Sequence, residues 1–268
     1  MNTPQTPPHT PLESSPELAV AQRGAVLWLT ITREERRNAM SHAVLAAMAQ
    51  AITAAQTDRS IRAIVITGAG SKAFCAGADL QSAKAFTTDY SEPHGHLAQV
   101  LRVAKASTVP LIARVNGACM AGGMGLMSMC DMAVAASHAV FGLPEVKVGV
   151  FPAQVLSVLQ HLIPRRKLAE MCLTGEPITA AQALEYGLVN YVDDDVDAKL
   201  QWLLERLLDK SPAAIRRGLY TMKKVEAMAF EESMAFTESQ IALFTLTDDA
   251  KDGQLAFQEK RKPVWKGQ

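Results

Sequence analysis

The fold is decided by a stretch that carries almost no charge, Val115–Glu145, with the sequence VNGACMAGGMGLMSMCDMAVAASHAVFGLPE. Asp131 is its only formal charge before Glu145. Charged side chains are rarely buried unless they are paired, so we expect this stretch to be the most buried part of the chain. Its pattern predicts a short buried helix over 122–130, followed by strands over 132–136 and 140–141.

Strands and helices alternate on the N-terminal side of this stretch. Runs of β-branched and apolar residues predict strands over 25–31, 61–67 and 109–115. Ser41 is expected to cap a helix whose apolar residues repeat at helical spacing, and a second helix is predicted over 97–106. A long irregular loop is predicted over 71–96. This alternation indicates an α/β core with parallel strands.

The C-terminal third is predicted to be helical, with helices over 164–173, 179–186, 195–209, 212–228 and 230–246. Helices appended to an α/β core serve either as a lid or as an oligomerisation arm, and apolar stripes alone do not separate the two. The N-terminus is rich in proline and is expected to be a flexible tail. We therefore divide the chain into a tail at 1–17, a core at 18–200 and a helical region at 201–268.

Composition excludes several classes of protein. The chain has 268 residues with 27 basic and 27 acidic side chains, which argues against nucleic-acid binding because such proteins usually carry a basic excess. The most apolar stretch, 115–130, carries no formal charge and is shorter than the roughly 20 residues that span a bilayer. The four cysteines show no CxxC spacing, so buried free thiols of a cytoplasmic protein are expected, with no membrane association.

Glu145 is the first candidate for chemistry. It follows a strand without charged residues, which is expected to be buried, and it comes directly after the rigid Pro144. Burial would raise the pKa of this carboxyl, so that it could carry a proton. The alternative is a carboxylate satisfied by a helix N-terminus or by a nearby arginine.

Glycine placement gives a second candidate. Gly77-Ala78-Asp79 lies in the predicted irregular loop, and Ala121-Gly122-Gly123 opens a helix after a strand. Glycines let the backbone approach a ligand, and the first turn of a helix has unpaired N–H groups. Two such groups that converge on one oxygen would form an oxyanion hole. The alternative is that these glycines serve only tight turns and close helix–strand packing.

A third pattern, Gly68-Ala69-Gly70-Ser71-Lys72-Ala73, matches GxGxxA after a strand, with Asp89 about 20 residues further on. It outlines a dinucleotide fingerprint, but the following residues, 74–80, make a poor helix start. Walker A, HExxH and GxSxG patterns are absent from the sequence. His94 and His96 are expected to be solvated rather than catalytic.

Taken together, these features resemble the crotonase (enoyl-CoA hydratase/isomerase) superfamily. The resemblance runs in collinear order over roughly residues 18–265. Its matches are Arg33 with Asn38-Ala39-Met40, the segment 72–80 (KAFCAGADL), Asn116-Gly117, Ala121-Gly122-Gly123, Cys130-Asp131, the segment 141–145 (FGLPE), the segment 173–178 (LTGEPI) and the segment 259–263 (EKRKP).

The resemblance implies a superhelix of ββα turns with a C-terminal helical region that forms a homotrimer or a dimer of trimers. It implies an acyl-CoA substrate, of which coenzyme A is a part, and no metal or other cofactor. The thioester oxygen would be held by the backbone N–H groups of Ala78 and Gly122, beside the acid/base Glu145. The implied substrate-binding residues are Ala73, Cys75 and Ala76 near the adenine, Asp79 and Leu80 along the acyl chain, and Gly123, Gly125 and Pro144 nearby. The basic run Lys260–Lys262 would reach CoA phosphates or form ordinary surface charge.

One position departs from the hydratases of this family, which hold a water molecule between two glutamates. The second glutamate corresponds to Glu145, but Gly125 occupies the position of the first. The glycine-rich stretch that usually follows is also changed, to Ala153-Gln154-Val155-Leu156. A single carboxylate suits double-bond migration better than hydration, unless another acid from the 85–96 loop substitutes for the missing glutamate. The alternative is an acyl-CoA-binding relative that has lost catalysis.

Overall fold

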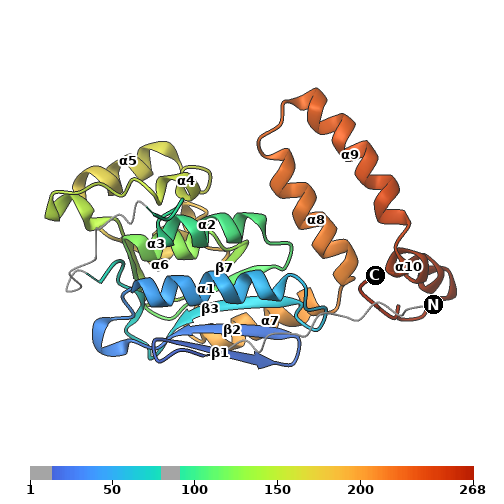
Figure 1. The fold of residues 1–268 in the computed structure, drawn as a ribbon, viewed down its shortest axis with the longest axis horizontal. Helices are drawn as coiled ribbons and strands as arrows, with labels where there is room; N and C mark the ends of the chain where they lie inside the picture. The colour runs from blue at the N-terminus through green and yellow to red at the C-terminus, as the bar shows by residue number, and fades with distance from the viewer. Residues whose placement is uncertain (1–13, 80–90) are drawn as a thin grey trace.

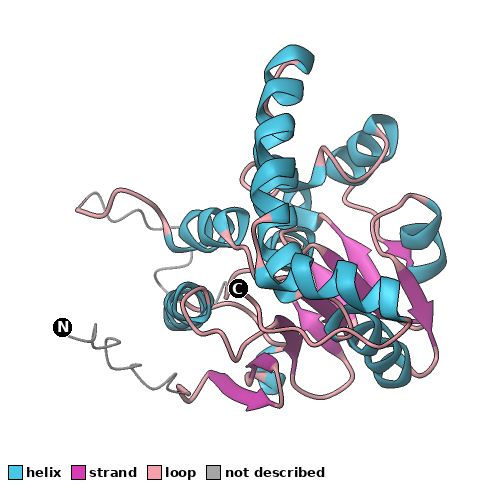
Figure 2. Ribbon diagram, turned by 90° about the vertical axis from the view of Figure 1, so that its right-hand side faces the viewer, coloured by secondary structure: helices cyan, strands magenta, loops and turns pink. Residues whose placement is uncertain are grey.

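The chain forms two β-sheets surrounded by helices (Figures 1 and 2) in a computed structural model that describes residues 14–79 and 91–268. The larger sheet consists of β1 (Leu18–Arg23), β2 (Val26–Ile31), β3 (Ala63–Gly68), β5 (Leu111–Val115), β7 (Met132–Ala136) and β10 (Tyr191–Asp193), in that order. The smaller sheet consists of β4 (Ala73–Cys75), β6 (Ala118–Met120), β8 (Val140–Gly142) and β9 (Ile178–Thr179).

Successive strand pairs divide between the two sheets. In β3/β4, β5/β6 and β7/β8, the first strand joins the larger sheet and the second joins the smaller one. The first two pairs are followed by helices α2 (His96–Ala106) and α3 (Gly122–Ser128), and the third by the 3-10 helix η2 (Pro144–Val148). Strands from successive pairs are parallel in both sheets. This repetition is the predicted superhelix of ββα turns.

The remaining helices lie around the sheets and extend beyond them. They are η1 (Glu34–Arg36), α1 (His42–Ala55), α4 (Leu156–Leu159), α5 (Arg165–Thr174), α6 (Ala180–Glu185), α7 (Val196–Leu208), α8 (Pro212–Val225), α9 (Phe230–Thr245) and α10 (Asp248–Glu259). As the sequence predicts, the Ser41 hydroxyl accepts a hydrogen bond from the Val44 amide and caps α1.

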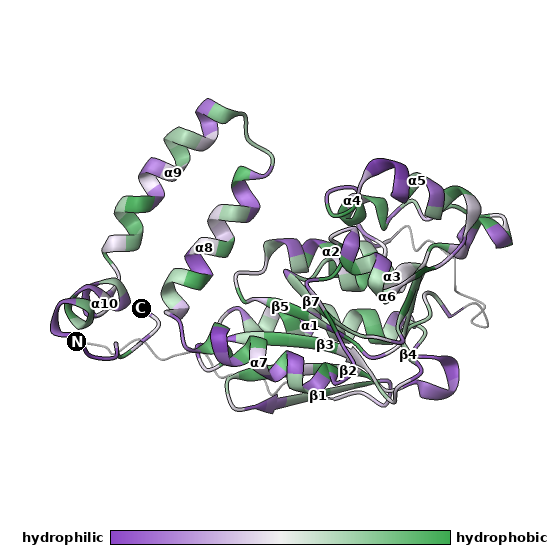
Figure 3. Ribbon diagram, turned by 180° about the vertical axis from the view of Figure 1, so that it is seen from behind, coloured by the Kyte–Doolittle hydropathy of each residue, from purple (hydrophilic) through white to green (hydrophobic). Residues whose placement is uncertain are grey.

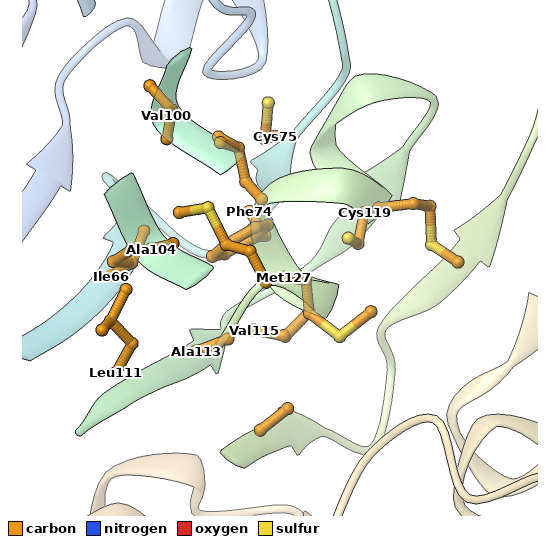
Figure 4. Close-up of a cluster of buried hydrophobic side chains, with 14 of the residues drawn as sticks. Ile66, Phe74, Cys75, Val100, Ala104, Leu111, Ala113, Val115, Cys119 and Met127 are labelled. Atoms are coloured by element: carbon orange, nitrogen blue, oxygen red, sulfur yellow. The ribbon is translucent and has the colours of Figure 1, made fainter. Parts of the chain in front are cut away.

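Alternation along the strands creates a core on each face of the larger sheet. On β3, Ile64 and Ile66 belong to the main cluster, whereas Ala63 and Val65 pack with α7 on the other face. A strand covered on both faces reads as a continuous apolar run, which is why 61–67 was recognisable in the sequence. In the main cluster, Phe74 of β4 is fully buried among Ile66, Leu111, Val115 and Met127 (Figure 4).

The helices α8 and α9 stand away from the sheets (Figures 1 and 3). Basic side chains attach α8 to the core. Arg216 donates to the carbonyl oxygens of Gln56, Asp58 and Ile61, and Lys223 forms an ion pair with Asp131 at 3.0 Å. No α8 residue is fully buried, and these charged contacts connect the helix to the core.

Short edge elements are the main departures from the sequence predictions. The segment 71–96 was expected to be irregular, but it contains β4 and the start of α2. β1, β6, β10 and α4 were not predicted either, because three- or four-residue elements and half-exposed edges carry little periodicity. The helix α10 was also not predicted, because only Asp249 and Ala256 of its 12 residues are buried and it presents no continuous apolar face. Within the predicted tail, Ser15 forms a backbone bridge with Leu18, and residues 1–13 lie outside the described part of the chain.

Among the described residues, no helix combines the length and the hydrophobicity that crossing a membrane requires.

We predict that Phe74→Ala lowers the free energy of unfolding by about 3–5 kcal/mol, because it removes a fully buried aromatic ring and leaves a cavity. Urea denaturation checks this prediction. Leu173→Ala on α5, where the leucine is 70% exposed, is the control and should change stability by less than about 0.5 kcal/mol. Equal losses in the two variants would contradict the burial of Phe74.

Candidate active site

Several of the predicted site residues meet in one cavity of about 610 Å³, a size typical of small-molecule sites. Ala76, Ala78, Asp79, Gly122, Pro144 and Glu145 all line it. Ala73, Cys75, Gly123 and Gly125 do not line it, and Leu80 lies outside the described residues. Ala73 and Cys75 are instead buried on β4.

Backbone pairing with Met40 positions the Ala78 amide. The Met40 amide donates to the Gly77 carbonyl at 2.8 Å, and the Asp79 amide donates to the Met40 carbonyl at 3.1 Å. Successive amides of an extended segment point to opposite sides, so the Ala78 N–H points away from Met40. Within 14–79 and 91–268 this N–H has no acceptor, which leaves it available to a ligand.

The second amide, that of Gly122, lies at the first residue of α3, where helical N–H groups lack partners within the helix. Ala121 before it adopts φ 52° and ψ −125°, a conformation that is costly for a residue with a side chain. The Ala121 amide donates to the Gly142 carbonyl at 2.8 Å, which holds this turn in place. No acceptor for the Gly122 N–H is found in the described chain either.

The two backbone segments approach each other closely. A β-carbon at Gly77, whose φ is +96°, would lie 2.7 Å from the Ala121 β-carbon and 3.4 Å from the Gly122 nitrogen. Both the conformation and the close approach therefore require glycine at position 77. The Ala78 and Gly122 amides thus lie on adjoining segments of one cavity wall. One anionic oxygen could accept a hydrogen bond from each of them there.

Polar side chains beneath the site fix the segments that carry these amides. The buried Asn38 amide donates to the carbonyls of Ala69 and Ala73 at 2.9 and 2.7 Å. The Arg33 guanidinium donates to the Ala39 carbonyl and forms an ion pair with Asp79, both at 2.6 Å. Asp79 thus anchors the segment that carries Ala78, a role that the sequence did not reveal.

Glu145 lies on η2, immediately after Pro144. Its Oε2 atom is buried and has no hydrogen-bond partner among the described residues. Burial raises the pKa of this carboxyl, and a hydrogen bond with its own backbone opposes the shift. Oε2 bonds to neither alternative partner in the described chain, but the carboxyl does bond to the Glu145 backbone in the first turn of η2, so a helix N-terminus satisfies it in part. A half-buried carboxyl with a raised pKa is suited to taking up and returning a proton.

The position of Gly125 is closed by a neighbouring side chain. A β-carbon at Gly125 would lie 2.8 Å from Cγ1 of Val155, and Val155 is only 2% exposed. Val155 also lines the cavity. The two departures noted in the sequence, at 125 and at 153–156, are therefore parts of one packing arrangement, in which the valine fills the space above the glycine.

Two histidines in the cavity wall were not predicted as site residues. His42 begins α1, and His96 begins α2. His94 is exposed as expected, but His96 is half-buried and faces the same cavity as Glu145. The sequence does not show that these two rings are close together, because they belong to helices and are 54 positions apart.

The structure bears on two other types of site. Gly68–Ala73 leads into strand β4 and not into a helix, so the helix N-terminus that a dinucleotide pyrophosphate needs is missing there. No cluster of three or more metal-ligating side chains occurs in 14–79 or 91–268. The four cysteines are free, and burial raises the pKa of Cys75 to about 12, so this thiol is not a nucleophile at neutral pH.

We predict that Glu145→Gln stabilises the fold at neutral pH. Because the folded pKa of Glu145 lies above its ordinary value of 4.5, ionisation of this carboxyl opposes folding. The stabilising contribution of the protonated carboxyl is complete below pH 4.5 and is lost as the pH rises through the folded pKa. Thermal melting should therefore show an advantage of the variant that grows with pH across this window.

The control for this measurement is Glu185→Gln on the exposed surface of α6. A Glu145→Gln variant whose melting temperature falls further below that of the unmodified protein as the pH rises would refute the effect of burial.

Comparison with known proteins identifies the family of the chain. Residues 21–268 match the family model described as Enoyl-CoA hydratase/isomerase. Over 94% of its length the chain is 36% identical to enoyl-CoA hydratase EchA19 of Mycobacterium tuberculosis, covering 97% of that protein, and 32% identical to crotonyl-CoA hydratase of Syntrophomonas wolfei, covering 95%. The crystal structure of a Mycobacterium smegmatis enoyl-CoA hydratase superposes with a TM-score of 0.88 at 32% identity, over 94% of this chain and 99% of that one. The chain therefore belongs to the enoyl-CoA hydratase/isomerase family, within the crotonase superfamily, and is an enzyme of this type.

Proposed function

We propose that this enzyme moves the double bond of an enoyl-CoA thioester through an enolate, with Glu145 as the single acid/base. Two carboxyls line the cavity in the described chain, and Asp79 is already paired with Arg33. The observation that carries the proposal is the other carboxyl, that of Glu145, in the same wall as two backbone amides without an acceptor among the described residues, with position 125 closed by Val155. Removal of an α- or γ-proton from the acyl group places negative charge on the thioester oxygen. The Ala78 and Gly122 N–H groups would stabilise that charge, and one such donor is typically worth about 2.7–4 kcal/mol.

Glu145 would both remove the proton and return it. Burial moves the pKa of this carboxyl upward, towards neutral pH. A group that both takes up and returns a proton works best when its pKa is near the pH of the reaction. Hydration needs a second group to position water, and Gly125 supplies none. Migration within one acyl chain needs only a base that reaches two carbons. Double-bond migration is thus favoured over hydration.

The proposed substrate contacts differ in kind. Ala78 and Gly122 would act through their amides, and Ala76, Asp79 and Pro144 through the cavity wall that they form. Ala73, Cys75 and Gly123 lie one layer below that wall and would shape it indirectly; Cys75 packs against the backbone of Gly123. No other cofactor enters this mechanism. We further propose that α8–α10 form the trimer interface, since Phe230, Ile241 and Phe257 are 72, 65 and 86% exposed.

We predict that Glu145→Gln lowers kcat by about 10²–10⁴-fold, the usual contribution of a positioned acid/base, while the Kd for acyl-CoA stays unchanged. Product analysis by mass spectrometry on 2-enoyl- and 3-enoyl-CoA, with calorimetric binding, checks this. Undiminished turnover would remove Glu145 from the mechanism. If the unmodified enzyme binds every thioester but converts none of them, the alternative is favoured, namely a non-catalytic acyl-CoA binder. The glycine at position 125 is the observation that motivates this alternative.

We predict that Gly125→Glu alone gives no hydratase activity, because the new side chain meets Val155. The double variant Gly125→Glu/Val155→Gly opens this space and should hydrate a short 2-enoyl-CoA faster than either single variant. Val155→Gly alone is the matched control for the loss of the valine. Equal hydration by the Gly125→Glu single variant and the double variant would show that Val155 does not close the position.

A further inference from the structure

A second cavity, of about 930 Å³, lies between α8 and the core. Its lining comes from α2, from the end of α3 and the residues after it, from the segment 153–162, and from α8 with the two residues that follow it. Ala153 and Gln154 line both this cavity and the active-site cavity, so the two are neighbours. The mechanism proposed above uses only the active-site cavity.

Three segments of the chain lead from the active-site cavity to the second cavity. At the start of α2, residues 96–97 line the active-site cavity, and the next turns, within 98–105, line the second. On α3, Gly122 at the first position lines the active-site cavity, and Ser128 at the last position lines the second. The segment that contains α4 likewise begins in one wall and ends in the other. The second cavity therefore continues the first in a single direction.

The distance between the two cavities is that of a medium-length acyl chain. Ser128 follows Gly122 by six residues on α3, which corresponds to about 9 Å along the helix. An extended chain advances about 1.2 Å per bond, so about eight bonds beyond the thioester carbonyl reach the second cavity. At the junction, Ala153 presents only a methyl group, and the carboxamide of the exposed Gln154 forms no hydrogen bond within the described chain.

Most of the accessible surface of the second cavity is apolar. The Ser128 hydroxyl is buried without a hydrogen-bond partner among the described residues, so it adds almost no accessible polar surface. The larger apolar residues of the lining are Leu101, Met129, Val158, Leu162, Leu219 and Met222. A surface of this kind favours a hydrocarbon chain, because burying methylenes removes apolar area from water.

The charged side chains in this lining are mostly paired with one another. Lys105 of α2 forms an ion pair with Glu226, and Lys223 of α8 forms one with Asp131 at 3.0 Å. The remaining ionisable residues of the lining are both exposed to water, Arg102 and His161. An uncharged chain can therefore occupy the cavity without separating either ion pair.

We propose that this enzyme acts on long-chain acyl-CoA thioesters, and that the second cavity holds the distal methylenes of an acyl chain of about ten or more carbons. The inference rests on the proposed function, because it takes the active-site cavity to be the acyl-CoA site. A short thioester would occupy only the active-site cavity. The second cavity thus selects for chain length.

The test measures calorimetric Kd values for saturated butanoyl-, octanoyl- and dodecanoyl-CoA, each below its micelle concentration. Leu162→Trp and Leu219→Trp fill the second cavity from the residues after α4 and from α8, and neither leucine lines the active-site cavity. Leu173→Trp is the matched control, because this leucine is 70% exposed and lines neither cavity. Melting curves verify that each variant is folded. Leu162 is itself 38% exposed, so its replacement should be tolerated even if that of Leu219 is not.

The unmodified enzyme is expected to bind dodecanoyl-CoA about tenfold or more tightly than octanoyl-CoA, since one buried methylene typically changes Kd about fourfold. Each folded variant in the second cavity should lose most of this gain and should bind butanoyl-CoA as the unmodified enzyme does. The Leu173→Trp control should keep the gain.

Two results would overturn the proposal. One is an equal Kd for octanoyl- and dodecanoyl-CoA in the unmodified enzyme. The other is a gain that persists undiminished in every folded variant of the second cavity, because the chain would then lie elsewhere. Neither result touches the proposed function, since saturated thioesters undergo neither hydration nor migration. Failure of the unmodified enzyme to bind any of the three thioesters would contradict both proposals.

Discussion

The site depends on one backbone contact, the pairing of Met40 with residues 77–79. The two hydrogen bonds of Met40 use the Gly77 carbonyl and the Asp79 amide, so the intervening Ala78 N–H is left for the cavity. Arg33 holds the same segment through Asp79, and Asn38 holds the turn before β4. A preorganised donor needs no rearrangement when charge develops on a substrate, and this is the condition for electrostatic catalysis.

The opposite side of the site, around Ala121 and Gly122, is fixed by a backbone hydrogen bond and by side-chain packing. Ala121 keeps a costly conformation because its amide is tied to Gly142, and the next amide, that of Gly122, is left without a partner in the described chain. Glu145 is desolvated on the adjoining turn, and Val155 fills the space above Gly125. Because Asp79 is paired with Arg33, these features leave Glu145 as the unpaired acid beside two donors among the described residues. The proposed double-bond migration follows from two features: Glu145 and the two amides are present, and position 125 carries no second carboxylate.

Much of the fold could be predicted because its strands are covered on both faces. The runs 25–31, 61–67 and 109–115 are predominantly apolar, and each corresponds to a strand of the larger sheet. The resemblance also identified Ala78, Gly122 and Glu145, which line one cavity. The Asp79–Arg33 pair, the closure of position 125 by Val155 and the contact of His42 with His96 were not accessible. Each joins residues at least thirty positions apart, and neither composition nor periodicity encodes such contacts.

The central claim is that two main-chain amides polarise a thioester carbonyl. Carbon-13 NMR of a saturated acyl-CoA labelled at the carbonyl carbon, recorded free and bound to the enzyme, measures this polarisation directly. The account predicts a downfield shift of the carbonyl resonance on binding, because hydrogen bonds to the oxygen withdraw electron density from the carbon. A resonance that stays at its free position when the enzyme is saturated would contradict the account.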